Sequence, residues 1–230
     1  MSLVTELERS PASIAALIEQ TNVDPVASRA DIERLCADVN RFGFHSAVVV
    51  PYHARLARDQ LGDTASVGTV IGFPYGVQST AAKRAEIDDL GEAVDEFDMV
   101  MNRTAFRNGD DDLVVEDIRG VRAAAGDRIL KCIIESPTLD PDAIARAARL
   151  VEEGGADFVK TAVGYDGPTD PTEVGLIREA VSDEMGVKAS GGIASYEDAL
   201  AMVEAGASRI GTSSGRAIMD SLPADDEGGV

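Results

Sequence analysis

The chain has 230 residues, of which 44% are hydrophobic and 27% are charged, and this composition is typical of one globular domain. Because 41 acidic residues against 21 basic ones give a net charge of −20, we expect neither nucleic acid nor a membrane surface as a partner. The chain has no apolar stretch of about 18 residues and no N-terminal secretory signal, so we expect a cytoplasmic protein.

Lysine is scarce among the basic residues, most of which are arginine. The four lysines are Lys83, Lys131, Lys160 and Lys188. An acidic, lysine-poor composition is typical of proteins from a high-salt cytoplasm, where counter-ions screen the repulsion between carboxylates. We therefore expect a halophilic source.

Cysteine and histidine form no metal-binding pattern in the sequence. Cys36 and Cys132 lie among apolar residues, and we expect both to be reduced thiols in the core. The two histidines, His45 and His53, are not clustered with cysteine, so we expect neither a metal ion nor another cofactor.

Short segments rich in Val and Ile alternate along the chain with amphipathic segments. A short helix over residues 10–16 leads into the first strand, and apolar residues three and four apart predict helices around residues 32–39, 144–151 and 196–203. We expect strands at residues 17–21, 46–50, 67–71, 97–101, 129–134, 158–161, 187–190 and 209–212.

Eight strand and helix units of about 29 residues each fill the chain, as a (β/α)8 barrel requires. The alternative, an open doubly wound sheet, would need a glycine-rich turn after its first strand, and the segment after Thr21 has none. We therefore predict a single-domain α/β (TIM) barrel over residues 1–220 with a short N-terminal helix. Residues 221–230 are expected to form an acidic, frayed tail.

Three of the four lysines fall within predicted consecutive strands, at Lys131, Lys160 and Lys188. Their spacings of 29 and 28 residues each equal one barrel unit, so inward-pointing side chains would meet in one cavity. Burial and mutual repulsion would then lower the pKa of at least one amine and make it a nucleophile for carbonyl chemistry. The residues alone leave two alternatives open, which are outward-pointing lysines and an electrostatic clamp for phosphate.

Two acids interrupt predicted strands in the same way. Asp98 divides the apolar run at residues 97–101 and could pair with the lysines or relay protons, although an aspartate at a strand entry can also cap a loop. Glu19 occupies a similar place in the first strand.

Glycine-rich turns follow the last two predicted strands, at residues 190–193 and 211–215. In barrels of this kind, the loops after strands seven and eight commonly bind phosphate through backbone N–H groups. We expect a phosphate site there.

Five segments, taken in order, resemble the deoxyribose-phosphate aldolases, which are class I, metal-independent aldolases on a (β/α)8 barrel. The similarity covers residues 18–218, and its most specific segments are residues 70–76, 97–102, 156–161, 186–193 and 209–215. The resemblance implies reversible cleavage of 2-deoxy-D-ribose 5-phosphate to acetaldehyde and D-glyceraldehyde 3-phosphate.

The resemblance also implies a role for each site residue. Lys160 would form the Schiff base, Lys188 would lower its pKa, and Asp98 would transfer protons with Lys188. The residues in supporting roles would be Lys131, Glu19 and Thr21. The phosphate pocket would be made by Gly164, Gly191, Gly192, Gly211, Ser213 and Ser214. Related barrels are often dimers or larger, so we expect a homo-oligomer.

The chain departs from the family pattern close to this site. Glu19-Gln20 stands where Asp followed by His or Leu is usual, Val49 where a strand-two cysteine is common, and Ala162-Val163 where two hydroxyl side chains are usual. Lost hydroxyls can change specificity. A class I aldolase for another sugar phosphate, and a sugar-phosphate-binding barrel without catalysis, therefore stay as alternatives.

Overall fold

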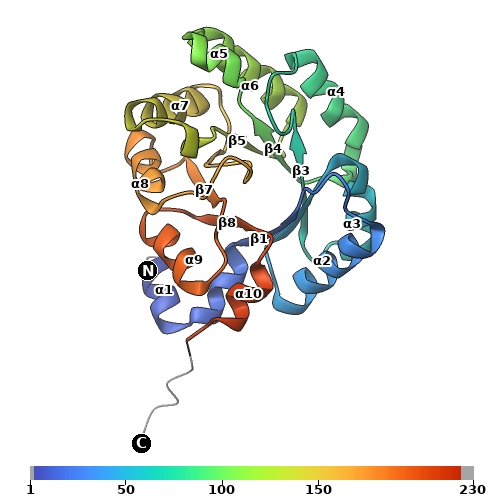
Figure 1. Ribbon diagram of the computed structural model, residues 1–230. Coiled ribbons are helices and arrows are strands. Elements are labelled where there is room, and N and C mark those ends of the chain that lie inside the picture. Colours follow the sequence, from blue (N-terminus) through green and yellow to red (C-terminus); the bar gives the residue numbers. More distant parts are fainter. Residues whose placement is uncertain (1–2, 224–230) are drawn as a thin grey trace, which may run out of the picture.

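The computed structural model describes residues 3–223 and forms a closed barrel of eight parallel strands in sequence order, surrounded by helices (Figure 1). The strands are β1 (Ile18–Asn22), β2 (Ser46–Val49), β3 (Ser66–Ile71), β4 (Glu96–Val100), β5 (Ile129–Ile133), β6 (Phe158–Lys160), β7 (Gly186–Ser190) and β8 (Arg209–Thr212). The predicted (β/α)8 barrel is confirmed.

The helices are α1 (Leu3–Arg9), α2 (Arg29–Phe42), α3 (Ala54–Leu61), α4 (Thr80–Leu90), α5 (Arg103–Asn108), α6 (Asp111–Ala125), α7 (Pro141–Glu153), α8 (Pro171–Ala180), α9 (Tyr196–Glu204) and α10 (Gly215–Asp220). Short 3-10 helices lie at Pro11–Leu17, Pro51–His53, Gly91–Ala93 and Ser136–Thr138. Among the helices of residues 3–223, none combines the length and the apolar character needed to cross a membrane.

Each predicted strand overlaps an observed one, and no predicted bound differs from the observed one by more than one residue. The helix expected at residues 10–16 is a 3-10 helix, and α1 precedes it, which the sequence prediction lacked. Leu7 of α1 is buried, and its carbonyl accepts a hydrogen bond from the Tyr196 hydroxyl of α9 at 3.4 Å. Of the acidic tail expected at residues 221–230, residues 224–230 lie outside the described part of the chain.

Strand register decides which side chains enter the barrel, because alternate residues of a strand point to opposite faces. Asp98 pairs with Lys131 on β5, and Lys160 pairs with Lys188 on β7, so these four side chains share the inner face. Charged groups therefore occupy the interior positions that Val, Ile and Leu usually fill in such barrels.

The outer faces of the strands pack against the helices in an apolar layer. This layer includes Val49 and both free cysteines, Cys36 and Cys132. Val49 therefore points away from the barrel interior, and Val48, paired with Thr21, faces it. The substitution at Val49 thus lies outside the charged interior.

Lys83 is also fully buried, although it lies on α4 and outside the barrel. Its Nζ atom lies 2.5 Å from Asp117 Oδ2 of α6 and donates to the carbonyl of Val100 at 2.9 Å. The pair ties two outer helices to the carboxyl end of β4, the strand that carries Asp98.

We predict that Asp117→Asn lowers the free energy of unfolding by about 3–5 kcal/mol, because Lys83 would remain as a buried charge without a counter-ion. Glu33→Gln is the control, since Glu33 forms an exposed pair with Arg29 at 3.7 Å, and it should cost less than about 0.5 kcal/mol. Denaturant unfolding measures both values. Equal losses in the two variants would contradict the role given to the buried pair.

Candidate active site

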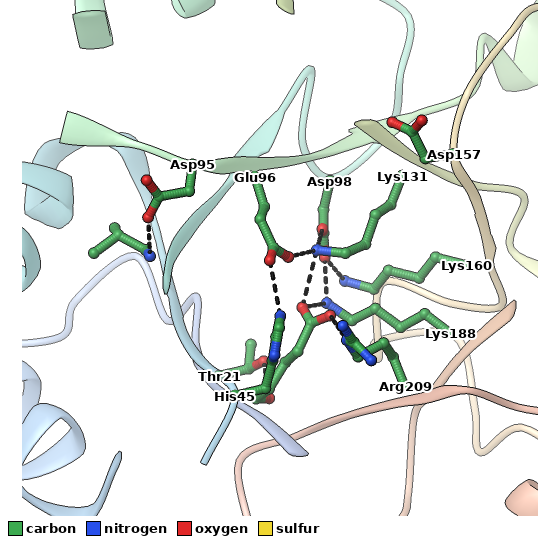
Figure 2. Close-up of polar contacts among 12 residues, drawn as sticks. Thr21, His45, Asp95, Glu96, Asp98, Lys131, Asp157, Lys160, Lys188 and Arg209 are labelled. Atoms are coloured by element: carbon green, nitrogen blue, oxygen red, sulfur yellow. Dashed lines mark hydrogen bonds and ion pairs between the residues drawn. The ribbon is translucent and has the colours of Figure 1, made fainter. Parts of the chain in front are cut away.

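Six charged side chains meet inside the barrel, and all of them are buried. Glu19 comes from β1, and Figure 2 shows the others converging from strands β4, β5, β6 and β7. The acids are Glu19, Glu96 and Asp98, and the bases are Lys131, Lys160 and Lys188. The sequence predicted that the three lysines and Asp98 would converge, and the structure brings them together.

Asp98 lies at the centre of this cluster. Its Oδ2 accepts hydrogen bonds from Lys160 and Lys188, both at 2.7 Å, and its Oδ1 accepts one from Lys131 at 3.1 Å. Burial by itself would raise the pKa of the Asp98 carboxyl, but the three ammonium groups outweigh burial and hold the pKa well below its usual range. Asp98 is therefore an anion that three lysines share.

The three lysines differ in how many carboxylates they contact. Lys131 contacts Glu19, Glu96 and Asp98, and Lys188 contacts Glu19 and Asp98. Burial opposes the charge on Lys131, but its three carboxylates raise its pKa above the usual range, so it stays an ammonium ion. This environment favours Lys131 as a counter-ion over Lys131 as a nucleophile.

Lys160 contacts Asp98 alone among these carboxylates. Burial lowers the pKa of Lys160, the ammonium of Lys188 lowers it further, and Asp98 only partly opposes them, so that the pKa falls to about 8. With this pKa about a tenth of Lys160 is a free amine at pH 7, far more than for a lysine of ordinary pKa. Of the three lysines, Lys160 is the one that lines the cavity above the cluster.

A cavity of about 890 Å³ opens at the carboxyl ends of the strands. Lys160 lines it, together with residues of β3, of helix α2 and of the loops that follow β1, β3, β6, β7 and β8. Of the residues predicted to form the site, those that line this cavity are Thr21, Lys160, Gly164, Gly191, Gly192, Gly211, Ser213 and Ser214.

The two glycine-rich loops after β7 and β8 are linked to each other. Thr212 Oγ1 donates to the carbonyl of Ile193 at 2.7 Å and accepts from the N–H of Ser214 at 2.8 Å. Gly192 has φ 77°, and a Cβ atom there would lie 2.7 Å from the Cβ of Pro168. Within residues 3–223, no protein group accepts a hydrogen bond from the backbone N–H of Gly192 or Ser213. Both groups can therefore bind an anion.

Gln20 holds the loop after β8 from the side of β1. Its Nε2 donates to the carbonyl of Ser213 at 3.3 Å, and its Oε1 accepts from the N–H of Gly215 at 3.0 Å. The residue that departs from the family pattern thus binds the backbone of the predicted phosphate loop with both ends of its amide.

Comparison with known proteins agrees with this geometry. The family model described as DeoC/LacD family aldolase matches residues 13–221. The chain belongs to this aldolase family. Deoxyribose-phosphate aldolases from Streptococcus suis and Methanothermobacter thermautotrophicus are similar in sequence. The first is 44% identical over 213 residues, which cover 91% of this chain and 97% of the relative. The second is 46% identical over 211 residues, which cover 90% and 94%.

A solved structure described as the unique tetrameric structure of deoxyribose phosphate aldolase from Aeropyrum pernix has a TM-score of 0.85 and 30% identity to this chain, with 95% of each chain covered. The family membership makes the chain an aldolase, an enzyme of the lyase class.

Three further predicted site residues of this aldolase, Glu19, Thr21 and Gly211, surround the lysine cluster. Glu19 is buried and accepts from Lys131 at 3.1 Å and from Lys188. Thr21 lies above it on β1, and its hydroxyl donates to the Glu19 carbonyl at 3.0 Å. Gly211 leaves room for Lys188, because a Cβ atom at this position would lie 2.8 Å from the Lys188 Cε.

Glu96 and His45 belong to the cluster but were not predicted from the sequence. Glu96 contacts Lys131 and lies 2.9 Å from the Nε2 atom of His45 at the amino-terminal side of the barrel. Although burial opposes the shift, His45 and Lys131 lower the pKa of Glu96 to about 2. The signal for Glu96 was present, since it lies two residues before Asp98 and therefore on the same strand face.

Glu19, His45 and Glu96 also place three possible metal-ligand atoms within 4.8 Å of one another. The Lys131 ammonium contacts both carboxylates and already supplies the positive charge that a cation would bring. A divalent ion would have to displace Lys131 or lie against it, so the arrangement disfavours a metal site.

We predict that the reactivity of the Lys160 amine rises with pH and levels off above pH about 8, because only the deprotonated amine is nucleophilic. Lys188→Met removes the neighbouring ammonium and should move this midpoint upward, toward the ordinary value of 10.5. Acylation of Lys160 by a small neutral ester, followed by peptide mass spectrometry across a pH series, measures both midpoints. An unchanged midpoint in the variant would contradict the electrostatic coupling of the two lysines.

Proposed function

We propose that this aldolase reversibly cleaves 2-deoxy-D-ribose 5-phosphate to acetaldehyde and D-glyceraldehyde 3-phosphate through a Schiff base on Lys160. The observation that carries the proposal is the asymmetry among the lysines. Lys160 has one carboxylate neighbour and a lowered pKa, and it lines the cavity. Lys131 contacts three carboxylates and Lys188 contacts two, and neither of them lines the cavity.

The reaction begins when the neutral Lys160 amine attacks the aldehyde carbon of the open-chain sugar. Loss of water gives an iminium ion, which withdraws electrons from the neighbouring carbon–carbon bond. The bond between C2 and C3 breaks as the C3 hydroxyl loses its proton, and glyceraldehyde 3-phosphate leaves. The remaining enamine takes up a proton at C2, and hydrolysis releases acetaldehyde and the free amine.

Asp98 and Lys188 are assigned to proton transfer. Both lie next to the Lys160 nitrogen, because Asp98 Oδ2 is 2.7 Å from each of the two Nζ atoms. When Lys160 is neutral, the Lys188 ammonium and the Asp98 carboxylate can exchange protons with a group bound to Lys160. Glu19 and Lys131 hold this pair in place from below.

The phosphate of the substrate is assigned to the loops after β7 and β8. The backbone N–H groups of Gly192 and Ser213, which have no protein acceptor among the described residues, support this assignment. Two hydrogen bonds from the Gln20 side chain fix the backbone of the loop after β8. A protein of net charge −20 repels an anionic substrate, so its phosphate needs a local site with the positive partial charge that backbone N–H groups supply. Gly164, Gly191, Gly211 and Ser214 complete the pocket wall.

A second candidate function is a class I aldolase for another sugar phosphate. Ala162 and Val163 line the cavity directly after Thr161 with apolar side chains. A site that lacks hydroxyl partners holds the hydroxyls of its substrate less specifically.

A substrate panel separates these two functions and tests the catalytic lysine. We predict acetaldehyde release from 2-deoxyribose 5-phosphate at a kcat/KM at least about 100-fold above that for unphosphorylated 2-deoxyribose or other pentose and hexose phosphates. Lys160→Arg should lose turnover, because arginine stays protonated and forms no imine. Arg119→Lys, on the exposed face of α6, is the matched control and should keep full activity. Faster cleavage of another phosphate, or activity in Lys160→Arg, would contradict the proposal.

We further propose that the protein works as a homo-oligomer in a halophilic cytoplasm. Both cysteines are buried and unpaired, and burial raises their pKa values to about 11 for Cys36 and about 12 for Cys132, which suits a reducing compartment. The tetrameric description of the Aeropyrum pernix relative supports an oligomer.

The net charge of −20 predicts a salt-dependent stability. The melting temperature should rise as potassium chloride increases from about 0.1 M to about 1 M, because a Debye length that shrinks from about 10 Å to about 3 Å weakens repulsion between surface carboxylates. Calorimetry in a potassium chloride series measures this. Equal melting temperatures at low and high salt would refute a halophilic adaptation.

A further inference from the structure

Glu135 lies at the end of β5 in a backbone conformation that normally favours glycine. Its φ and ψ are 59° and 53°, and it is the one non-glycine residue of residues 3–223 with a positive φ. The N–H of Ile134 donates to the Lys160 carbonyl at 3.0 Å, and the N–H of Ser136 donates to the Thr161 carbonyl at 2.9 Å. The pairing with the next strand thus holds Glu135 in a strained conformation from both sides.

The side chain of Glu135 is also in an unfavourable environment. It is fully buried, and its Oε2 accepts one hydrogen bond, from the N–H of Val163 at 2.9 Å. Its Oε1 has no partner among the described residues. Burial raises the pKa of the Glu135 carboxyl above its usual range. A carboxylate with one buried hydrogen bond opposes folding, so stability explains neither its backbone nor its side chain.

Val163 belongs to the segment that follows Lys160 directly. Residues 162–165 form one wall of the cavity. At the start of this segment, the Thr161 hydroxyl donates to the Ser190 carbonyl at 2.9 Å, and beyond its end Arg103 donates to Asp166 at 3.1 Å. The hydrogen bond from the Val163 N–H to Glu135 lies between these two interactions and fixes the middle of the segment.

We propose that Glu135 is a positioning residue that fixes the backbone beside Lys160 through the Val163 N–H. Its rigid backbone sets where the carboxylate lies, and the hydrogen bond sets how closely residues 162–164 approach the reacting nitrogen. The charged groups that act on its carboxylate are Arg103, Asp166 and Lys160. The proposal rests on the proposed Schiff-base chemistry at Lys160.

Two nearly isosteric substitutions separate the hydrogen bond from the charge and the volume. Glu135→Gln and Glu135→Met both remove the charge, but only glutamine can accept from the Val163 N–H. We expect Glu135→Gln to keep kcat within about threefold of the parent enzyme and Glu135→Met to lose kcat by tenfold or more, since a small misplacement near the reacting atoms is costly. Rescue by the amide identifies the acceptor as the functional element.

Glu135→Gly provides a second variant that relaxes the backbone. It also lacks the acceptor, so we expect the same loss of kcat as in Glu135→Met together with a melting temperature at or above that of the parent. Ser136→Ala is the matched control, because the Ser136 hydroxyl donates to Glu173 and leaves the cavity wall untouched. It should keep kcat.

Unchanged kcat in Glu135→Met and Glu135→Gly would overturn the proposal, as would equal losses in the Gln and Met variants. Borohydride trapping of acetaldehyde on Lys160 is measured in the same proteins. A parent enzyme that forms the imine but cleaves no 2-deoxyribose 5-phosphate contradicts the substrate assignment alone. In that case the trapping rates still test Glu135, because we expect faster trapping in Glu135→Gln than in Glu135→Met, and equal rates would overturn the proposal.

Discussion

The shared carboxylate of Asp98 is the interaction on which the interior of this barrel depends. Three lysines on neighbouring strands point into the interior of the barrel, and their buried charges need close counter-ions. Asp98 contacts all three Nζ atoms, and two glutamates complete a balance of three acids with three bases. Without Asp98, ammonium groups would face each other in a low-dielectric cavity.

The uneven distribution of the carboxylates then gives the three lysines different pKa values and different chemical roles. Lys131, the lysine with most carboxylate neighbours, is fixed as an ammonium ion, and Lys160, with one carboxylate and the cavity above it, titrates near pH 8. Lys131, Lys188 and Lys160 contact three, two and one of these carboxylates, and the lysine with one contact is the one that lines the cavity. This unequal pairing is the basis for proposing Lys160 as the reactive amine.

Much of this could be predicted from the sequence, because strand length, unit length and the alternation of side chains are local properties. The one-unit spacing of Lys131, Lys160 and Lys188 placed them on neighbouring strands before their contacts were known. The contact partners of these side chains could not be predicted, because they depend on how distant strands and loops meet when the barrel closes. Gln20 reaches a loop 193 to 195 residues away, and Glu135 takes its conformation from pairing with β6.

The most direct test of Lys160 as the nucleophile is borohydride reduction of the protein with 2-deoxyribose 5-phosphate in about 1 M potassium chloride, a concentration that screens surface repulsion, followed by peptide mass spectrometry. We expect one stable adduct, located on Lys160, and none on Lys131 or Lys188. An adduct on either of the other two lysines, or no adduct in a folded protein that cleaves the substrate, would contradict the assignment of Lys160 as the nucleophile.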